Sequence, residues 1–276
     1  MRVLSALFAF YIQASFHVAL SLVSLLVFTQ QLFAIRIEPA YYGALFFGSV
    51  AGYNAIKHAA EPWKYRKGRG SMSRAIFWLS LACALLALAL LTRLDLQTWL
   101  LLGFSALIAA LYALPVLPGF RNLRSFGLLK VGLVALVWTL VSLWIPLWDS
   151  GIFRERDLLV EGFQRLLWVS LLMLPFEVRD MQIDPPALRT LPRRLGLART
   201  RLLGWAGALL FVAATLLKEH PAQGELAIKG LAGLLTGLGI QGCREGQGPY
   251  YASFWIEAIP MAVAALYMAW GWVCCF

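Results

Sequence analysis

The sequence predicts an all-α polytopic membrane protein, a single domain over residues 1–276 with about nine transmembrane helices around a central cavity. The prediction rests on a composition that is 61% hydrophobic, only 14% charged and has a mean hydropathy of +0.73. A disordered chain needs far more charge, and four cysteines in 30.7 kDa are too few for a disulfide scaffold. The period-two alternation of a strand barrel is absent, so we expect helices.

Apolar segments long enough to cross a bilayer follow one another along the chain. Each crossing takes roughly 20 mostly apolar residues. In chain order, the segments are Phe16–Phe33, Tyr41–His58, Ser73–Leu91, Gln97–Leu114, Phe126–Trp148, Gly162–Val178, Thr200–Leu217, Leu226–Gly242 and Tyr251–Trp272. The shorter run Val3–Tyr11 lacks a clean cleavage site after it, so we expect an interfacial helix rather than a signal peptide.

The charged residues are divided unequally between the two sides of these spans. Of the 24 lysines and arginines, 17 lie at the N-terminus or in the connections that return to the same side, and Arg165 falls inside a span. Because such cations are retained in the cytoplasm, we expect a cytoplasmic N-terminus and, by similarity to bacterial proteins, the inner membrane. Attraction to anionic lipids is sufficient to explain a basic face. We therefore expect the lipid bilayer to be the partner of this face, and we expect no nucleic acid to bind it.

Three acidic residues lie where the sixth apolar segment meets its basic connection: Glu177, Asp180 and Asp184. Residues three, four and seven positions apart share one face of a helix, so these carboxylates would form an acidic stripe. Mg²⁺ takes one or two carboxylates together with substrate phosphates, and we therefore expect Asp180 and Asp184 to bind it. The alternative, which the spacing leaves equally open, is an ion pair with a neighbouring guanidinium, that of Arg179, Arg189 or Arg193.

A rigid basic connection follows the acidic residues. Pro185 and Pro186 come directly after Asp184, and residues 189–196 read R-T-L-P-R-R-L-G. The order D-x-x-x-D, a short linker, T-L-P and a glycine before the next helix resembles the second aspartate motif of the UbiA superfamily of intramembrane prenyltransferases. The resemblance covers most of the chain in layout and Asp180–Gly196 in motif. It implies nine spans and two acidic motifs that face a cytoplasmic opening.

The first motif of that family is largely missing from this chain. In the family, an Asn near the end of the second span is followed by Asp four and eight residues later, and both motifs together hold Mg²⁺ and an isoprenoid diphosphate. Asn54 stands at the matching place, but His58 and Pro62 occupy the aspartate positions. We expect Asn54, Lys57 and His58 to contact the substrate, with Lys57 and His58 supplying part of the missing charge. A snorkelling lysine at a span end is the alternative for Lys57.

A third feature of the family, a Tyr with a Lys four residues later after the fourth span, is half kept. Tyr112 matches and is expected to bind substrate, while Val116 stands in place of the cation. Arg194 of the basic connection is a further candidate for the diphosphate. The resemblance also places an acid near the start of the last span, where Glu257 lies, although a structural role is equally open there. The substitutes for the missing cation, which spacing does not separate, are Arg121, Arg124 and Lys130.

The resemblance implies the reaction. Mg²⁺ on Asp180 and Asp184 would bind the diphosphate of a polyprenyl donor and promote ionisation to an allylic cation, which a lipophilic acceptor attacks. The tail would lie between helices, where each buried methylene favours the apolar site by about 0.8 kcal/mol. Trp138 or Trp168 would stabilise the cation, although tryptophans of membrane proteins mostly pack or anchor the interface.

The missing aspartates leave two interpretations of different kinds. The first is a membrane prenyltransferase with weakened or altered activity, and the second is a non-catalytic relative that binds a lipid or a partner protein. A transporter is a weaker third, because several prolines lie near span ends but no inverted repeat marks a midplane site.

Overall fold

The computed structural model describes residues 2–59, 71–113, 127–150, 155–182 and 190–274, and within them it contains helices and no strand. In chain order the α-helices and the short π and 3-10 segments (η) are α1 (Arg2–Gln13), α2 (Phe16–Phe33), α3 (Pro39–Ala59), α5 (Ser71–Leu91), α6 (Leu96–Ala113), α7 (Gly127–Thr139), η2 (Leu140–Trp144), α8 (Ile145–Ser150), α9 (Glu155–Asp180), α10 (Leu191–Ala213), η3 (Ala214–Leu217), α11 (Glu225–Gln241), η4 (Tyr251–Ile256) and α12 (Ala258–Cys274).

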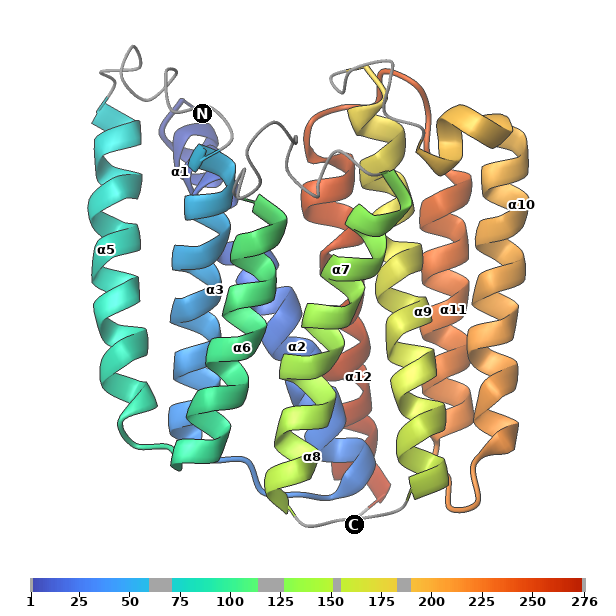
Figure 1. Cartoon of the computed structure of the whole chain (residues 1–276). Coiled ribbons are helices and arrows are strands. Elements are labelled where there is room, and N and C mark those ends of the chain that lie inside the picture. Colours follow the sequence, from blue (N-terminus) through green and yellow to red (C-terminus); the bar gives the residue numbers. More distant parts are fainter. Residues whose placement is uncertain (1, 60–70, 114–126, 151–154, 183–189, 275–276) are drawn as a thin grey trace.

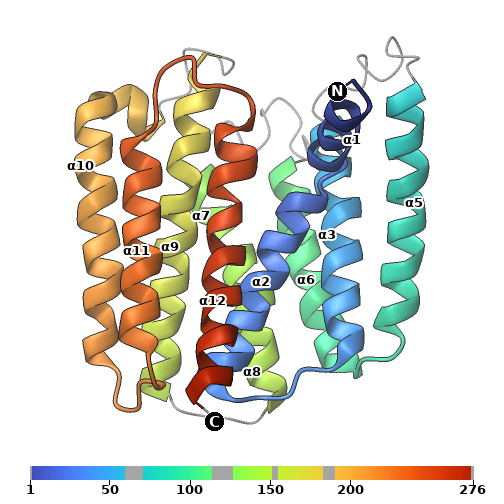
Figure 2. The same cartoon turned by 180° about the vertical axis from the view of Figure 1, so that it is seen from behind.

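The long helices form an upright bundle with the two termini at opposite ends (Figure 1 and, from behind, Figure 2). Each expected span coincides with one helix or one continuous run of segments, such as α7, η2 and α8. The all-α bundle is therefore confirmed, while the number of crossings stays a prediction. Within the described ranges, six helical stretches are long and apolar enough to cross a membrane: Phe16–Phe33, Met72–Leu91, Leu129–Trp148, Glu155–Asp180, Leu191–Leu217 and Tyr251–Gly271.

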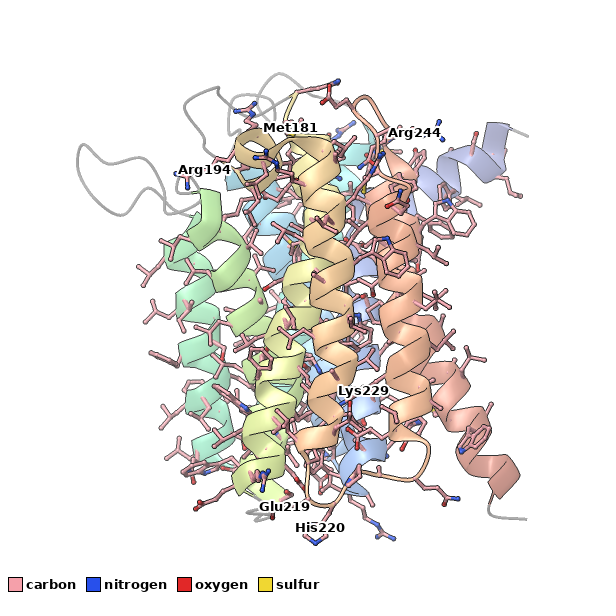
Figure 3. The ribbon with its side chains drawn as sticks, turned by 90° about the vertical axis from the view of Figure 1, so that its right-hand side faces the viewer. Met181, Arg194, Glu219, His220, Lys229 and Arg244 are labelled. Carbon is pink, nitrogen blue, oxygen red and sulfur yellow. The ribbon has the colours of Figure 1, made fainter. Side chains whose placement is uncertain are left out.

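The two ends of the bundle differ in charge, as the sequence predicts. The N-terminus, Met181, Arg194 and Arg244 lie at one end, which we call the basic end, and Glu219 and His220 lie at the opposite end (Figures 1 and 3). The described residues of the basic connections thus lie together at one end of the bundle. Which end faces the cytoplasm stays a prediction.

The apolar core lies where α2, α9, α10 and α12 meet. Trp168 of α9 is 1% exposed, stacks on Phe211 at 5.4 Å between ring centroids and meets Phe28 edge to face. Its indole N–H donates to the Thr236 hydroxyl at 3.0 Å. Trp168 is therefore a packing residue and does not line the cavity described below.

The helix α10 starts earlier than the expected Thr200, because it begins with a bent first turn. Thr190 precedes it in an extended conformation and Pro192 occupies its first turn, where a missing N–H has no cost. Gly196 then takes φ 75° and ψ 163°, a non-helical conformation that favours glycine. The T-L-P and glycine of the sequence motif thus build a sharp turn that starts the seventh expected span.

A network of buried charges ties α9 to α11 at the end opposite the basic end. The Glu161 carboxylate pairs with Lys229 at 2.5 Å, with Lys218 at 2.8 Å and with Arg165 at 3.3 Å. Both lysines also pair with Glu225, at 2.7 and 2.5 Å. Glu161, Lys218, Glu225 and Lys229 are buried, with at most 3% of each side chain exposed.

Candidate functional site

A cavity of about 1020 Å³ lies inside the bundle, enclosed mainly by α2, α3, α5, α6, α7, α9 and η4 with the residue that follows it. Most of its wall is apolar. The described charged residues that line it are Lys57, Arg179, Asp180 and Glu257. All four belong to helix segments that reach the basic end: the last turns of α3 and α9, and the residue before α12 (Figure 1). The cavity therefore has one charged end and a long apolar part.

Asp180, the last residue of α9, lines the charged end of this cavity. Its Oδ1 accepts a hydrogen bond from Arg179 Nε at 2.8 Å, and its Oδ2 lies 3.5 Å from Lys130 Nζ. Glu177, one turn earlier, is 1% exposed and pairs with the same Lys130 at 2.8 Å. The ion-pair alternative is therefore present, through Arg179, in an Asp180 that also lines the cavity. Binding of Mg²⁺ by Asp180 stays a prediction.

The acidic stripe does not run along one continuous helix. The helix α9 ends at Asp180, and Met181 and Gln182 form a turn, so the expectation of a helix through Asp184 is wrong. Asp184 itself lies outside the described residues. The sequence gives a physical reason, because the ring of a proline inside a helix clashes with the carbonyl four residues earlier, which for Pro185 is that of Met181. The guanidinium of Arg193 donates to the Met181 carbonyl and so satisfies a free acceptor at this helix end.

Asn54 and Lys57 occupy different environments although they are one turn apart on α3. Asn54 is fully buried: it accepts from Ser15 Oγ at 2.7 Å and donates to the Ala14 carbonyl and to Ser80 Oγ. These bonds join the α1–α2 corner to α3 and α5. Lys57 lines the cavity and donates to the same Ser15 hydroxyl at 2.8 Å. Substrate contact by either residue stays a prediction, but only Lys57 reaches the cavity.

The other expected substrate residues lie at the basic end in three different settings. His58 and Tyr112 belong to α3 and α6, and their side chains lie outside the described part of the structure. Lys130 of α7 is buried between Glu177 and Asp180. Arg194 is exposed at the start of α10 and does not line the cavity.

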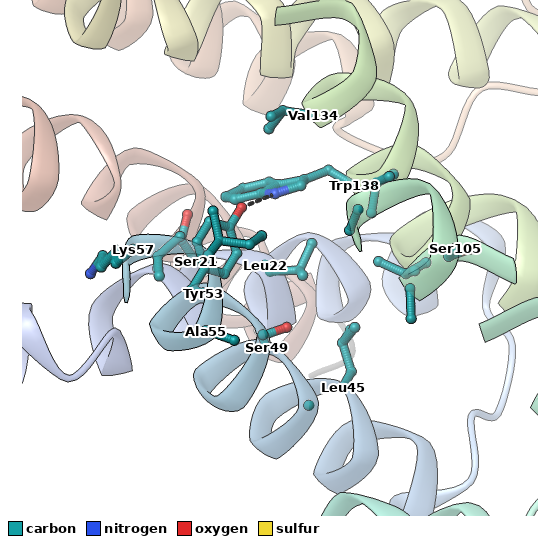
Figure 4. Close-up of a pocket in the computed structure, with 18 of the residues that line it drawn as sticks. Ser21, Leu22, Leu45, Ser49, Tyr53, Ala55, Lys57, Ser105, Val134 and Trp138 are labelled. Carbon is teal, nitrogen blue, oxygen red and sulfur yellow. Dashed lines mark hydrogen bonds between the residues drawn. The ribbon is translucent and has the colours of Figure 1, made fainter. Parts of the chain in front are cut away.

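An aromatic pair crosses the cavity below its charged end. Trp138 of α7 donates its indole N–H to the Tyr53 hydroxyl of α3 at 2.6 Å, and both side chains line the cavity (Figure 4). Tyr53 precedes Lys57 by one helical turn, about 6 Å along the axis. Of the two tryptophans that the sequence offered for a cation, Trp138 therefore lies in the cavity and Trp168 in the core.

The charged side chains that line this end of the cavity, together with the buried pair Lys130 and Glu177, balance one another. Three cations stand against three acids: Lys57, Lys130 and Arg179 against Glu177, Asp180 and Glu257. No group of three or more metal-ligating side chains occurs among the described residues. Asp180 and Glu257 nevertheless offer carboxylate oxygens to one cavity, and Mg²⁺ needs only one or two carboxylates when phosphates complete its shell. The donors therefore fit a metal that is shared with a phosphate ligand.

Comparison with known proteins identifies the fold. No protein-family model matches the sequence, and no curated protein matches it. Two solved structures of a UbiA homologue from Archaeoglobus fulgidus, one bound to GPP and Mg²⁺ and one bound to DMAPP and Mg²⁺, match with a TM-score of 0.67 each. Each match has 14% sequence identity and covers 94% of this chain and 98% of the other. The chain therefore has the UbiA fold over nearly its whole length, which confirms the fold that the resemblance implied.

Proposed function

We propose that this chain is a membrane prenyltransferase that moves an isoprenoid group from a polyprenyl diphosphate to a lipophilic acceptor. The observation that carries the proposal is the long apolar cavity with Asp180, Arg179, Lys57 and Glu257 at one end. Such a cavity suits an amphiphile with an apolar tail and an anionic head. The neighbours of the same fold were solved with GPP or DMAPP and with Mg²⁺, which supports this choice of ligand.

Charge balance supports a role for Mg²⁺. A diphosphate carries about three negative charges, whereas the six charged side chains named above balance one another, so these six leave the head uncompensated. Asp180, together with Asp184, would hold the ion, and Glu257 offers a further carboxylate to the same cavity. When bound, Mg²⁺ would neutralise the charge that builds up on the departing diphosphate.

In the transfer, the bond between the first prenyl carbon and the diphosphate oxygen breaks, and its electron pair leaves with the diphosphate. A lone pair of the acceptor forms the new bond to that carbon, and the acceptor gives up a proton. Lys57 and Arg179 orient the head by charge, the apolar walls exclude water, and the ring of Trp138 faces the carbon that becomes positive. The membrane that surrounds the bundle would deliver both lipophilic substrates, and we propose a bacterial inner membrane with the basic end cytoplasmic.

One observation favours a second candidate, a lipid-binding protein without turnover. Both oxygens of Asp180 already face cations, Arg179 and Lys130. In addition, the positions of the first motif's aspartates hold His58 and Pro62. If the ion pairs of Asp180 persist when a ligand is bound, the head is held and the bond to the tail is not broken.

The test is transfer by the purified protein, with a labelled prenyl diphosphate, a panel of aromatic and lipid acceptors, and either Mg²⁺ or EDTA. We expect product that requires Mg²⁺ and that falls by about 100-fold or more in Asp180→Asn, since that change removes a metal ligand. Glu219→Gln, an exposed acid at the opposite end, is the matched control and should be unaffected. Product that is unchanged in Asp180→Asn would refute the metal role, and binding without any product would favour the second candidate.

A further inference from the structure

We propose that the cavity admits a prenyl tail of about four or five isoprene units, and that Gly52 and Gly103 are the specificity-determining positions that keep its path open. This inference rests on the proposed function and adds the length class of the donor. It is argued from the extent of the cavity along its helices and from the space beside these two glycines.

The cavity runs along most of the height of the bundle. On α5 its lining residues fall near the two ends of the helix, from Ser73 to Ile76 and from Ala87 to Leu91, and the first and last of them are about 27 Å apart at 1.5 Å per residue. On α3 they extend from Ala44 to Lys57, about 20 Å. Leu91 and Trp99, at the end of α5 and the start of α6, mark its far end, opposite the charged residues (Figure 1).

These lengths translate into a number of isoprene units. One unit contributes four backbone bonds of about 1.5 Å, which advance an extended chain by roughly 5 Å. A path of about 20 to 27 Å below the charged end therefore takes four or five extended units. The wall along this path is apolar and includes Leu45, Leu102 and Val137, so it offers a branched hydrocarbon only dispersion contacts.

Two glycines lie on this path with free space beside them. A Cβ atom added at Gly52 of α3 or at Gly103 of α6 would meet no atom within 4 Å, and both residues line the cavity. By contrast, a Cβ at Gly43 of α3 would come within 2.5 Å of Leu90, so that glycine serves the packing of α3 against α5. Gly52 and Gly103 serve no such packing, and a side chain at either one would enter the cavity.

The two glycines lie at different depths. Gly52 is five residues before Lys57, about 8 Å from the charged end, whereas Gly103 is four residues after Trp99, about 6 Å from the far end. A large side chain at Gly52 would therefore obstruct the tail after one or two units. The same side chain at Gly103 would obstruct only tails of about four units or more.

The experiment measures binding rather than turnover. Prenyl diphosphates of one to six units compete with a labelled donor for the purified protein in lipid nanodiscs with Mg²⁺, for the natural chain and for Gly52→Phe, Gly103→Phe and Gly230→Phe. Gly230 of α11 also has no atom within 4 Å of an added Cβ but does not line the cavity, so it is the matched control. Smaller Leu variants at the same positions, and the melting temperature of each variant without ligand, separate obstruction from misfolding.

We expect affinity to increase up to four or five units and then to stay level. Gly103→Phe should lower the affinity for the longest tails by about tenfold or more and leave the affinity for tails of one to three units unchanged. A phenyl ring in the path of the tail overfills the cavity there, and overpacking of this kind is destabilising. Gly52→Phe should weaken every tail beyond two units, and Gly230→Phe none.

The contrary outcomes are distinct. An affinity that keeps increasing through six units, or a Gly103→Phe variant with an unchanged length profile, would show that the tail leaves between the helices and would overturn the inference. If binding shows the expected dependence on tail length but no acceptor is prenylated, the inference about tail length stands and the proposed transferase activity is refuted. If the protein transfers tails of every length equally well, the transferase activity stands and the inference about tail length is refuted. If no donor binds, both proposals are refuted.

Discussion

At the scale of single residues, the cavity separates side chains that the sequence presents as equals. Lys57, Arg179, Asp180 and Glu257 come from three separate parts of the chain and share one cavity end. Asn54, one turn from Lys57, is instead taken up by three hydrogen bonds, two to the α1–α2 corner and one to Ser80 of α5. A polar side chain without water must be satisfied by protein partners or by a ligand. The polar groups of Asn54 are satisfied by protein partners alone, whereas Lys57 and Asp180 have protein partners and also line the cavity, where a ligand can reach them.

Trp138 carries a prediction at this scale. Replacing it by Leu removes the ring from the cavity wall, and a desolvated cation–π contact contributes about 2 kcal/mol, so kcat should fall by roughly 30-fold with KM little changed. Tyr53→Phe is the control, because it removes the hydroxyl that accepts the Trp138 hydrogen bond and keeps both rings. Steady-state kinetics with one donor check this, and a higher KM at unchanged kcat would instead show that Trp138 packs against the tail.

At the scale of elements, ends and neighbours of helices are fixed by different forces. The helix α9 ends at Asp180 for a local reason, the prolines that follow, and α10 bends at Gly196 for another local reason, its positive φ. The packing of α9 beside α11 has a non-local basis, the buried pairs of Glu161 with Lys218 and Lys229. Ionisable groups inside a membrane protein are expensive, and these are stable because each carboxylate meets two or more cations.

The buried network gives a prediction about stability. Glu161→Gln leaves Arg165 without its carboxylate and both lysines sharing Glu225. Breaking a buried pair in this way costs about 3–5 kcal/mol of unfolding free energy. Glu219→Gln at the same end breaks only the exposed pair with Arg156, which is worth about 0–1 kcal/mol. Thermal unfolding in detergent should therefore show a clear drop in Tm for the first variant and almost none for the second. Equal Tm values would mean that the network contributes no stability.

At the scale of the whole molecule, the bundle has a basic end, where the charged residues of the cavity lie, and an opposite end that holds the network of buried charges. Six helical stretches are long and apolar enough to cross a membrane within the described ranges. The charge difference between the ends favours an orientation with the N-terminus in the cytoplasm. In that orientation the proposed diphosphate head would be reached from the cytoplasm.

The orientation can be checked by labelling single cysteines. In a background with Cys274→Ser and Cys275→Ser, only the buried Cys83 and Cys243 remain. Glu219→Cys, at the end opposite the basic end, should react in intact cells with a membrane-impermeant maleimide. Arg244→Cys, at the basic end, should react only after the membrane is opened. The reverse labelling pattern would place the basic end, and with it the charged end of the cavity, on the outer side of the membrane.

The sequence by itself determined the helical bundle, the approximate positions of its helices and the basic end at which Asp180 lies. Those follow from local physics, because each membrane helix satisfies its own backbone hydrogen bonds over a length set by the bilayer. Only the tertiary structure decided that Lys130 lies between Glu177 and Asp180, that Trp138 rather than Trp168 faces the cavity, and that Glu161 is buried among cations. These contacts join residues of different helices, and hydropathy repeats only within one helix, so its pattern carries no record of which faces meet.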